Sequence, residues 1–527
     1  MTNINIKYII WIIIFFLIFI LFNSWENEKT INKSLEKKYI IDNSADQINK
    51  NSTKIKKNKI PEEISIETDL ISAKINLKGG NISTLSLKKY PKNLKEPIGI
   101  NIFTKTDKQA YFATSEFLNS DINNNESRIY YTNKKNYLLK TFDSHLIINL
   151  KHNLNNGFII NKIYIFKNYS YEIEVNFYIS NITDKILFGR IFGCITKQYN
   201  KIKTSWFTSQ NYEGTAIYTE KKMCRKISLD KIEKKDIIEI IVGGWLAHID
   251  NHFITAWIPT SNNNYMYSAT KNINFYNLKY INETELYIFP GECKYVHSTL
   301  FVGPKIKNYL HKLHKGLDLT IDYGIFWPIA ISIFLLLSKI HTIINNWGIA
   351  IIITTILIKL LFFQLSTISY KSLGHMKKLQ PRLDILKERY KENKKEYSQA
   401  ILEMYKNEKV NPLSGCLPIL IQIPVFISLY YVLLESVELR HAPFILWIND
   451  LSAKDSYYIL PIIMCLTMFI QQKLNPPIQD PFQQKIMLFM PFIFLLIFLQ
   501  FPAGLVLYWV INNILSILQQ WIITKTV

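Results

Sequence analysis

The sequence lacks the loops on which most catalytic folds depend. It contains no G-x-x-x-x-G-K-[ST], no G-x-G-x-x-G and no G-x-S-x-G, which argues against nucleotide hydrolysis, dinucleotide binding and a serine nucleophile. His248 and His252 are four residues apart, but Ile249 stands where a zincin has Glu, so ordinary histidines are favoured over a zinc pair. We therefore expect no enzyme, no catalytic residue, no metal site and no cofactor.

Cysteine and acidic residues are also scarce. Five cysteines occur among 527 residues, none in a C-x-x-C pair, and their spacing predicts no disulfide network. Lys and Arg outnumber Asp and Glu by 62 to 41, for a formal net charge of +21. Because Lys, Asn and Ile are frequent throughout, and no zinc-finger or RNP motif accompanies the scattered lysines, this charge does not indicate a DNA partner.

Long apolar runs are present, and they concentrate at the N-terminus and after about residue 325. Residues 8–22 (YIIWIIIFFLIFILF) follow Lys7, and no small-x-small cleavage site comes after them. We therefore expect a signal-anchor span over 1–22 that is not cleaved. Residues 23–60 are rich in Asn, Lys, Ser and Glu, a composition typical of a flexible linker.

Between the apolar regions the sequence repeats with period two. In YEIEVNFYI (171–179) apolar and polar residues alternate, as in a half-buried strand, and pairs such as Gly79-Gly80 and Gly243-Gly244 separate similar runs. Many short strands with turns between them predict a large antiparallel β-sandwich domain over 61–315. No internal repeat is visible.

The C-terminal part predicts a helical membrane domain over 346–527. Residues 325–337 are too short to span and contain Pro328, so we expect an interfacial amphipathic helix over 316–345. Five spans are expected after it, at about 347–366, 416–434, 457–471, 486–500 and 503–522. With the anchor, the fold class is a polytopic α-helical membrane protein of six spans, with a large β domain inserted.

Loop charge predicts the orientation. The loop 368–415 has eleven Lys or Arg against six acidic residues, whereas 435–456 has two against four. The positive-inside rule places the first loop in the cytoplasm and the second outside. Both termini are then cytoplasmic, and the β domain lies outside. Apolar residues at helical spacing on both sides of KENKK (391–395) predict a cytoplasmic helical hairpin over 370–412.

One charge interrupts the first of the five spans. Lys359 lies within WGIAIIITTILIKLLFF (347–363), where a cation costs about 2.5–3.5 kcal/mol on insertion scales. Either its ammonium snorkels to the inner interface, or it faces a wet groove with polar neighbours from other helices. The residues that could line such a groove with Lys359 are Thr355, Gln422, Tyr508, Trp509 and Asn512, with Asn513 and Ser516 nearby in the last span.

Several long segments resemble one known family. The stretches NWGIAIIITTILIKLLFFQLSTISYKSLGHMKKLQPRLDILKERY, NPLSGCLPILIQIPVFISLYYVLLESVELRHAPFILWINDLSA, DPFQQKIMLFMPFIFL, FPAGLVLYWVINNILSILQQ and, earlier, GGWLAHIDNHFITAWIP and GLDLTIDYGIFWP are similar to YidC membrane protein insertases of Gram-negative bacteria. The resemblance covers nearly all of the chain except 23–60, and it is loose over much of 100–240.

The resemblance implies a fold and an activity. It implies a five-span insertase core, a periplasmic β-supersandwich, and a cationic hydrophilic groove that is open to cytoplasm and lipid. It implies that the protein inserts and helps to assemble inner-membrane proteins, alone or with the Sec translocon. The implied partners are nascent client proteins, Sec components and membrane lipids, and a ribosome contact through the basic hairpin stays open.

The sequence departs from the family at two places. Lys359 occupies the place of the groove's usual Arg, which keeps the charge but loses the planar fork for bidentate carboxylate contacts. The chain stops soon after Lys525, so we do not expect ribosome docking through a basic tail.

Two other classes of function stay open for this sequence. A secondary transporter would require repeats and broken helices around a midplane site. A carbohydrate-processing enzyme would place the function in residues 62–310, and glycan binding by that domain would favour it.

Overall fold

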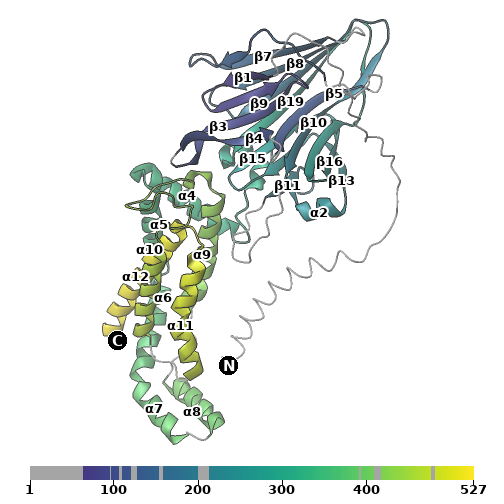
Figure 1. The fold of residues 1–527 in the computed structure, drawn as a ribbon. Coiled ribbons are helices and arrows are strands. Elements are labelled where there is room, and N and C mark those ends of the chain that lie inside the picture. The colour runs from purple at the N-terminus through teal and green to yellow at the C-terminus, as the bar shows by residue number, and fades with distance from the viewer. Residues whose placement is uncertain are drawn as a thin grey trace.

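The computed structural model describes residues 63–94, 96–105, 110–119, 128–153, 158–199, 213–390, 393–408, 417–475 and 481–526. The predicted anchor 1–22 and linker 23–60 lie outside the described residues, as does Cys416. Figure 1 shows a strand-rich domain at one end and a helical bundle that extends away from it.

The β domain begins with β1 and ends with β19. Its strands are β1 (Glu63–Glu67), β2 (Ile71–Asn76), β3 (Asn81–Asn93), β4 (Glu96–Lys105), β5 (Ala110–Leu118), β6 (Asn136–Leu138), β7 (His145–Asn153), β8 (Phe158–Lys167), β9 (Glu172–Asn181), β10 (Leu187–Gln198), β11 (Gly214–Ile217), β12 (Arg225–Ile227), β13 (Ile237–Val242), β14 (Leu246–Ile249), β15 (Phe253–Pro259), β16 (Asn264–Asn272), β17 (Phe275–Asn282), β18 (Leu286–Ile288) and β19 (Cys293–Pro304).

The strands form two sheets, as the period-two pattern predicts. One has eleven strands in the order β13-β16-β17-β10-β5-β4-β3-β2-β1-β6, with β18 on β10; the other has eight in the order β12-β11-β14-β15-β19-β9-β8-β7. All pairs are antiparallel except β1–β6, a difference from the expected antiparallel sandwich. The parallel pair is possible because a long connection separates the three-residue strand β6 from β1.

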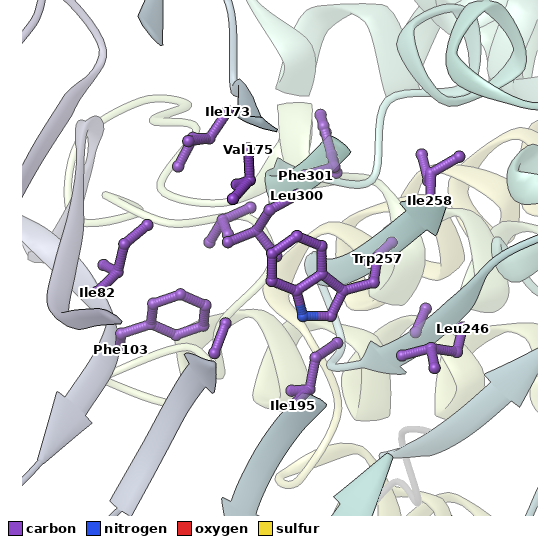
Figure 2. Close-up of a cluster of buried hydrophobic side chains, with 14 of the residues drawn as sticks. Ile82, Phe103, Ile173, Val175, Ile195, Leu246, Trp257, Ile258, Leu300 and Phe301 are labelled. Atoms are coloured by element: carbon purple, nitrogen blue, oxygen red, sulfur yellow. The ribbon is translucent and has the colours of Figure 1, made fainter. Parts of the chain in front are cut away.

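The core lies between the sheets. Along β5 every second side chain is buried, which is the alternation that the sequence predicted for this domain. In Figure 2, Phe103 of β4 and Ile195 of β10 extend from one sheet toward Trp257 of β15 and Leu300 of β19 in the other. Trp257 is 1 % exposed, so the two layers close over a dry interior.

Helices follow the last strand. They are α3 (Lys307–Leu313), α4 (Trp327–Ile344), α5 (Trp347–Leu361), α6 (Phe363–Lys378), α7 (Gln380–Arg389), α8 (Lys394–Asn407), α9 (Leu417–Glu435), α10 (Ile459–Leu474), α11 (Pro481–Phe498) and α12 (Ala503–Thr526), with 3-10 turns η1 (Leu317–Thr320) and η3 (Val437–Leu439); α2 (Leu229–Lys234) lies within the β domain. α12 packs against α5, α6, α9 and α10, and α4 packs against α5 and α9.

The span expected at 347–366 is not one straight helix. α5 and α6 meet at Phe362 and are bent by 68° relative to each other. Hydrophobic periodicity does not show this break, because both halves are helical, and the span itself stays a prediction. The polar residues Gln364, Ser366 and Thr367 begin at the bend, where the chain loses its continuous apolar character.

By length and composition, α4 and α12 are long and apolar enough to cross a membrane, and the bent pair α5–α6 would be a third span. The apolar parts of α9, α10 and α11 are shorter. α4 is longer than the apolar run 325–337, so its length does not require it to lie flat; its interfacial position stays a prediction.

The β domain is fixed to one end of the bundle. Val437 in the α9–α10 loop belongs to the buried core of the β domain, and Arg440 donates to the backbone oxygen of Lys92. Lys305, just after β19, forms a buried ion pair of 2.5 Å with Glu435 at the end of α9. The hairpin α7–α8 lies at the opposite end of the bundle (Figure 1).

Candidate functional site

Lys359 lies near the end of α5, three residues before the bend. Its Nζ donates a hydrogen bond of 2.7 Å to the Oγ of Ser516 on α12. No carboxylate among the described residues lies within 4.0 Å of this ammonium. The side chain is partly buried and directed toward α12, so the charge has a polar partner from another helix but no counter-ion there.

Ser516 is oriented by its own helix. Its Oγ donates to the backbone oxygen of Asn512 at 2.7 Å, one turn earlier. Since a hydroxyl has one proton and two lone pairs, this leaves the oxygen free to accept from Lys359. Ser516 is 3 % exposed, so the contact lies inside the bundle.

Three of the expected lining residues gather beside this pair. Gln422 of α9 donates through Nε2 to the hydroxyl of Tyr508 on α12. Thr355 is buried, but its hydroxyl donates to Ile351 within α5 at 2.7 Å. Tyr508 and Thr355 therefore face the junction of α5, α9 and α12, where Lys359 also lies.

Two pockets meet at this junction and share Ile358. One is lined by Lys359, Gln422 and Ser366 together with apolar residues that include Phe362 and Pro418. The other is lined mainly by apolar residues of α4, α5 and α9, with Thr354, Thr355 and Tyr508. Each pocket thus has three polar lining residues, and the charged one lies in the pocket next to the bend.

The other two expected residues are placed differently. Trp509 belongs to an aromatic cluster, with its ring centroid 4.9 Å from that of Phe426 and 5.5 Å from that of Phe498. Consecutive residues on a helix point about 100° apart, so Trp509 lies on a different side of α12 from Tyr508. Asn512 is 7 % exposed, and its Oδ1 accepts no hydrogen bond from the residues that the structure describes.

α12 carries more buried polar residues than the predicted set. Gln519 donates to the backbone oxygen of Phe363 at 3.1 Å, at the bend, and Asn513 donates to Thr467 of α10 at 3.2 Å. Gln520 donates to Asn475 at 2.9 Å. Polar residues recur in NNILSILQQ (512–520) at helical spacing within an apolar span, and this pattern was the signal that could have identified Gln519 and Gln520 as well.

His248 lies in β14, and His252 lies between β14 and β15. His248 is fully buried in β14, where its Nδ1 lies 3.0 Å from the hydroxyl of Tyr199, and burial holds its pKa well below the usual value. Within the described ranges, no group of three or more His, Cys, Asp or Glu side chains could hold a metal ion. Cys194, Cys224, Cys293 and Cys465 are free thiols.

Comparisons with known proteins match both parts of the chain. The family described as 60Kd inner membrane protein matches residues 339–527, and the YidC periplasmic domain matches residues 63–336. A membrane protein insertase YidC from Hahella chejuensis is 41% identical over 473 residues, which are 88% of this chain and 83% of that protein. One from Coxiella burnetii is 37% identical over 547 residues, covering 99% of this chain and 96% of the relative.

Solved structures resemble the chain at lower identity. The crystal structure of an active YidC insertase with its first transmembrane domain resolved is 18% identical, with a TM-score of 0.40, and covers 88% of this chain and 92% of that chain. A galactose mutarotase-like protein from Lactobacillus casei is 9% identical, with a TM-score of 0.33, and covers 46% of this chain and 99% of its own.

Proposed function

This chain belongs to the family of YidC membrane protein insertases, inner-membrane proteins with a periplasmic β-sandwich domain, and from that premise we propose how it inserts its clients. The five segments after residue 346 form the insertase core, and the junction of α5, α9 and α12 is a cationic groove for the client's polar segment. The protein acts alone or with the Sec translocon.

The observation that carries this proposal is the uncompensated charge of Lys359. Its ammonium has a serine hydroxyl as partner, and no described carboxylate lies within 4.0 Å. Because charges interact more strongly at low dielectric than in water, the cation attracts acidic residues in the outgoing tail of a client. The charge thus acts on the part of the client that most resists entering hydrocarbon.

Neutral polar groups replace part of the client's hydration. Gln422 lines a pocket with Lys359 and donates to Tyr508, and the amide oxygens of Asn512 and Gln519 are buried without a donor among the described residues. Buried acceptors without a partner cost free energy, so they favour a client's peptide or hydroxyl donors at this place. In this way the groove shortens the distance that the client's polar segment must cross through hydrocarbon.

The apolar part of the client takes a different path. Large side chains are exposed on α9 and α11, among them Leu420, Ile423, Phe489 and Leu496. A client helix slides along these faces into lipid while its tail passes the groove. The driving free energy comes from burial of client apolar surface and from the membrane potential, which contributes about 2.3 kcal/mol per charge and 100 mV.

The remaining partners follow from position and charge. The hairpin α7–α8 receives clients in the cytoplasm, at the end of the bundle away from the β domain. Its basic surface also allows contact with the ribosome. Both termini are cytoplasmic, and the segment 1–22 anchors the chain as a further span.

The experiment is insertion of a client into vesicles that contain the purified protein, read out by protease protection. Lys359→Ala should reduce insertion of a client with an acidic outgoing tail about tenfold, because roughly 1.4 kcal/mol of attraction is lost. Lys359→Arg should insert near the native level, since the charge is kept. A client with a neutral tail should be affected less.

Lys473 provides a matched control. It is an exposed lysine near the end of α10, with its ammonium 5.0 Å from the ring centroid of Phe469. Lys473→Ala should insert both clients as the native protein does. Equal insertion by Lys359→Ala and the native protein would reject the groove and leave Lys359 as a snorkelling residue.

A further inference from the structure

A lysine-rich edge of the β domain lies outside the site described above. We define the basic edge as residues 220–242, which contain α2 and β13; residues 220–236 carry seven Lys or Arg against four acidic residues. One of the acids, Glu233, is already bound by Lys271 and Tyr276. Five lysines of the basic edge are exposed and form no ion pair with any residue that the structure describes: Lys221, Lys222, Lys231, Lys234 and Lys235.

The basic edge also exposes aliphatic side chains. Ile238, Ile240 and Val242 alternate along β13 and are 56%, 58% and 50% exposed. The opposite face of the strand contributes Ile241 to the core, so the strand cannot turn its exposed face inward. β13 is the terminal strand of its sheet and pairs with β16 alone among the described strands.

Two contacts place the basic edge beside the start of α4. Lys226 forms an ion pair of 2.7 Å with Asp322, and Met223 packs so closely on Gly316 that a Cβ there would lie 2.7 Å from it. Asp322 is five residues before α4, whose first residues include the 59% exposed Trp327. In Figure 1, α2 lies at the lower margin of the β domain, at the height of α4.

From this juxtaposition we propose that the basic edge is a membrane-contact surface that binds anionic phospholipid headgroups of the periplasmic leaflet. The exposed lysines bind lipid phosphates, and Ile238, Ile240 and Val242 enter the interface between headgroups and acyl chains. Basic residues beside exposed aliphatic ones are the combination that interfacial binding requires. Each lysine near an anionic surface strengthens binding about fivefold.

The surface gives the β domain a second attachment beside its junction with the helical bundle. The first attachment, at Lys305 and Glu435, lies where the interior strand β19 ends, whereas the basic edge lies around β12 and β13, a terminal strand of each sheet. A lipid contact along β13, the terminal strand of its sheet, adds to this junction and restricts rocking of the domain over the bilayer. The domain's orientation then depends on the lipid composition of that leaflet.

The test measures the depth of a nitroxide at position 240 of the full chain, with the native cysteines replaced. Ile240→Cys is labelled in nanodiscs of phosphatidylcholine with phosphatidylglycerol, and accessibility to oxygen is compared with accessibility to a water-soluble nickel chelate. In these nanodiscs the label should be more accessible to oxygen than to the nickel chelate, as expected for a label at the depth of the headgroups. It should become water-exposed in phosphatidylcholine alone, and also when Lys231, Lys234 and Lys235 are changed to Gln.

Ile147→Cys is the matched control, because Ile147 is a 46% exposed strand residue on β7, at the far end of the domain (Figure 1). Its label should be water-exposed in both lipids. A label at 240 that is as water-exposed as the one at 147 in anionic nanodiscs would overturn the proposal. So would protection at 240 that arises only when a second membrane protein is added, because the edge would then be a protein interface.

Discussion

At the scale of single residues, the sequence identified the charge but not its contacts. Lys359 could be singled out because a cation in an apolar run is costly wherever it lies. Gln422 and Tyr508 could be suggested as neighbours, and the structure brings them together. Trp509 could not be placed, since the rotation of one helix against its neighbours depends on packing that a single sequence does not contain.

Ser516 illustrates the same limit. It stood among several polar residues of the last span, and nothing in its spacing set it apart from Asn512 or Asn513. Only the packing of α12 on α5 makes it the direct partner of Lys359. Residue type therefore predicts that a polar contact exists, and the tertiary structure decides which residue makes it.

A residue-scale prediction concerns His252, which lies between β14 and β15. Burial, with the nearby positive charges of Lys305 and Arg440, lowers its pKa from 6.5 to about 4. The unfolded chain therefore binds a proton between these pH values that the folded protein does not bind, so the free energy of unfolding falls as pH falls from 6.5 to 4. The loss is at most about 3.5 kcal/mol, because one pKa unit corresponds to about 1.4 kcal/mol.

Chemical unfolding followed by the far-UV signal of the sheets, across this pH range, measures the effect. His252→Gln should show a shallower pH dependence than the native chain. His145→Gln, at an exposed position on β7, should not differ from the native chain. If the free energy of unfolding depended on pH equally in the native protein and in His252→Gln, the lowered pKa of His252 would not be the cause of the pH dependence.

At the scale of elements, local patterns predicted the kinds of structure well. The alternation of apolar and polar residues predicted a strand-rich domain. The apolar runs predicted α9 to α12 within a few residues of their observed ends. Strand order could not be predicted, because pairs such as β10–β5 join residues that are far apart in the chain. The bend at Phe362 could not be predicted for a related reason. The backbone oxygen of Phe363, at the bend, accepts a hydrogen bond from Gln519, which is more than 150 residues away in the chain.

An element-scale prediction concerns the ion pair that joins β19 to α9. The side chains of Lys305 and Glu435 are 1% and 8% exposed. Lys305→Met would leave a buried carboxylate without its partner, and should lower the free energy of unfolding by about 3–5 kcal/mol. The double variant Lys305→Met/Glu435→Leu should recover most of this loss, because an apolar pair of similar size replaces the ions.

A double-mutant cycle by chemical unfolding in detergent checks this prediction. The exposed pair Arg382–Glu408 on the hairpin, with side chains 66% and 41% exposed, is the control. Arg382→Gln should change stability by less than about 1 kcal/mol. If the double variant were no more stable than Lys305→Met, burial of an unpaired charge would not be the cause of the loss.

At the scale of the whole molecule, loop charge predicts that the loop after α9 and the basic hairpin lie on opposite sides of the membrane, and this sidedness stays a prediction. The acidic loop after α9 contacts the β domain, and the basic hairpin lies at the other end of the bundle. This division follows from counting charges, which requires no knowledge of contacts. The number of spans is harder to predict, since α9, α10 and α11 are short and α4 is longer than its apolar run.

The whole-molecule prediction is one of sidedness. In chains with a single cysteine, Ile147→Cys on β7 should react with a membrane-impermeant maleimide in intact spheroplasts. Glu388→Cys, exposed on α7, should react only in inverted vesicles. Labelling of both positions from the same side would refute the predicted topology.

The most direct test of the central claim is a charge exchange between the groove and the client. Insertion is measured in vesicles without a membrane potential, with Lys or Glu at position 359 and with clients whose outgoing tails are acidic or basic. If the charge at 359 attracts the tail, Lys359→Glu should insert the acidic client poorly and the basic client better than the native protein does. Insertion of both clients at native rates by Lys359→Glu would contradict the account.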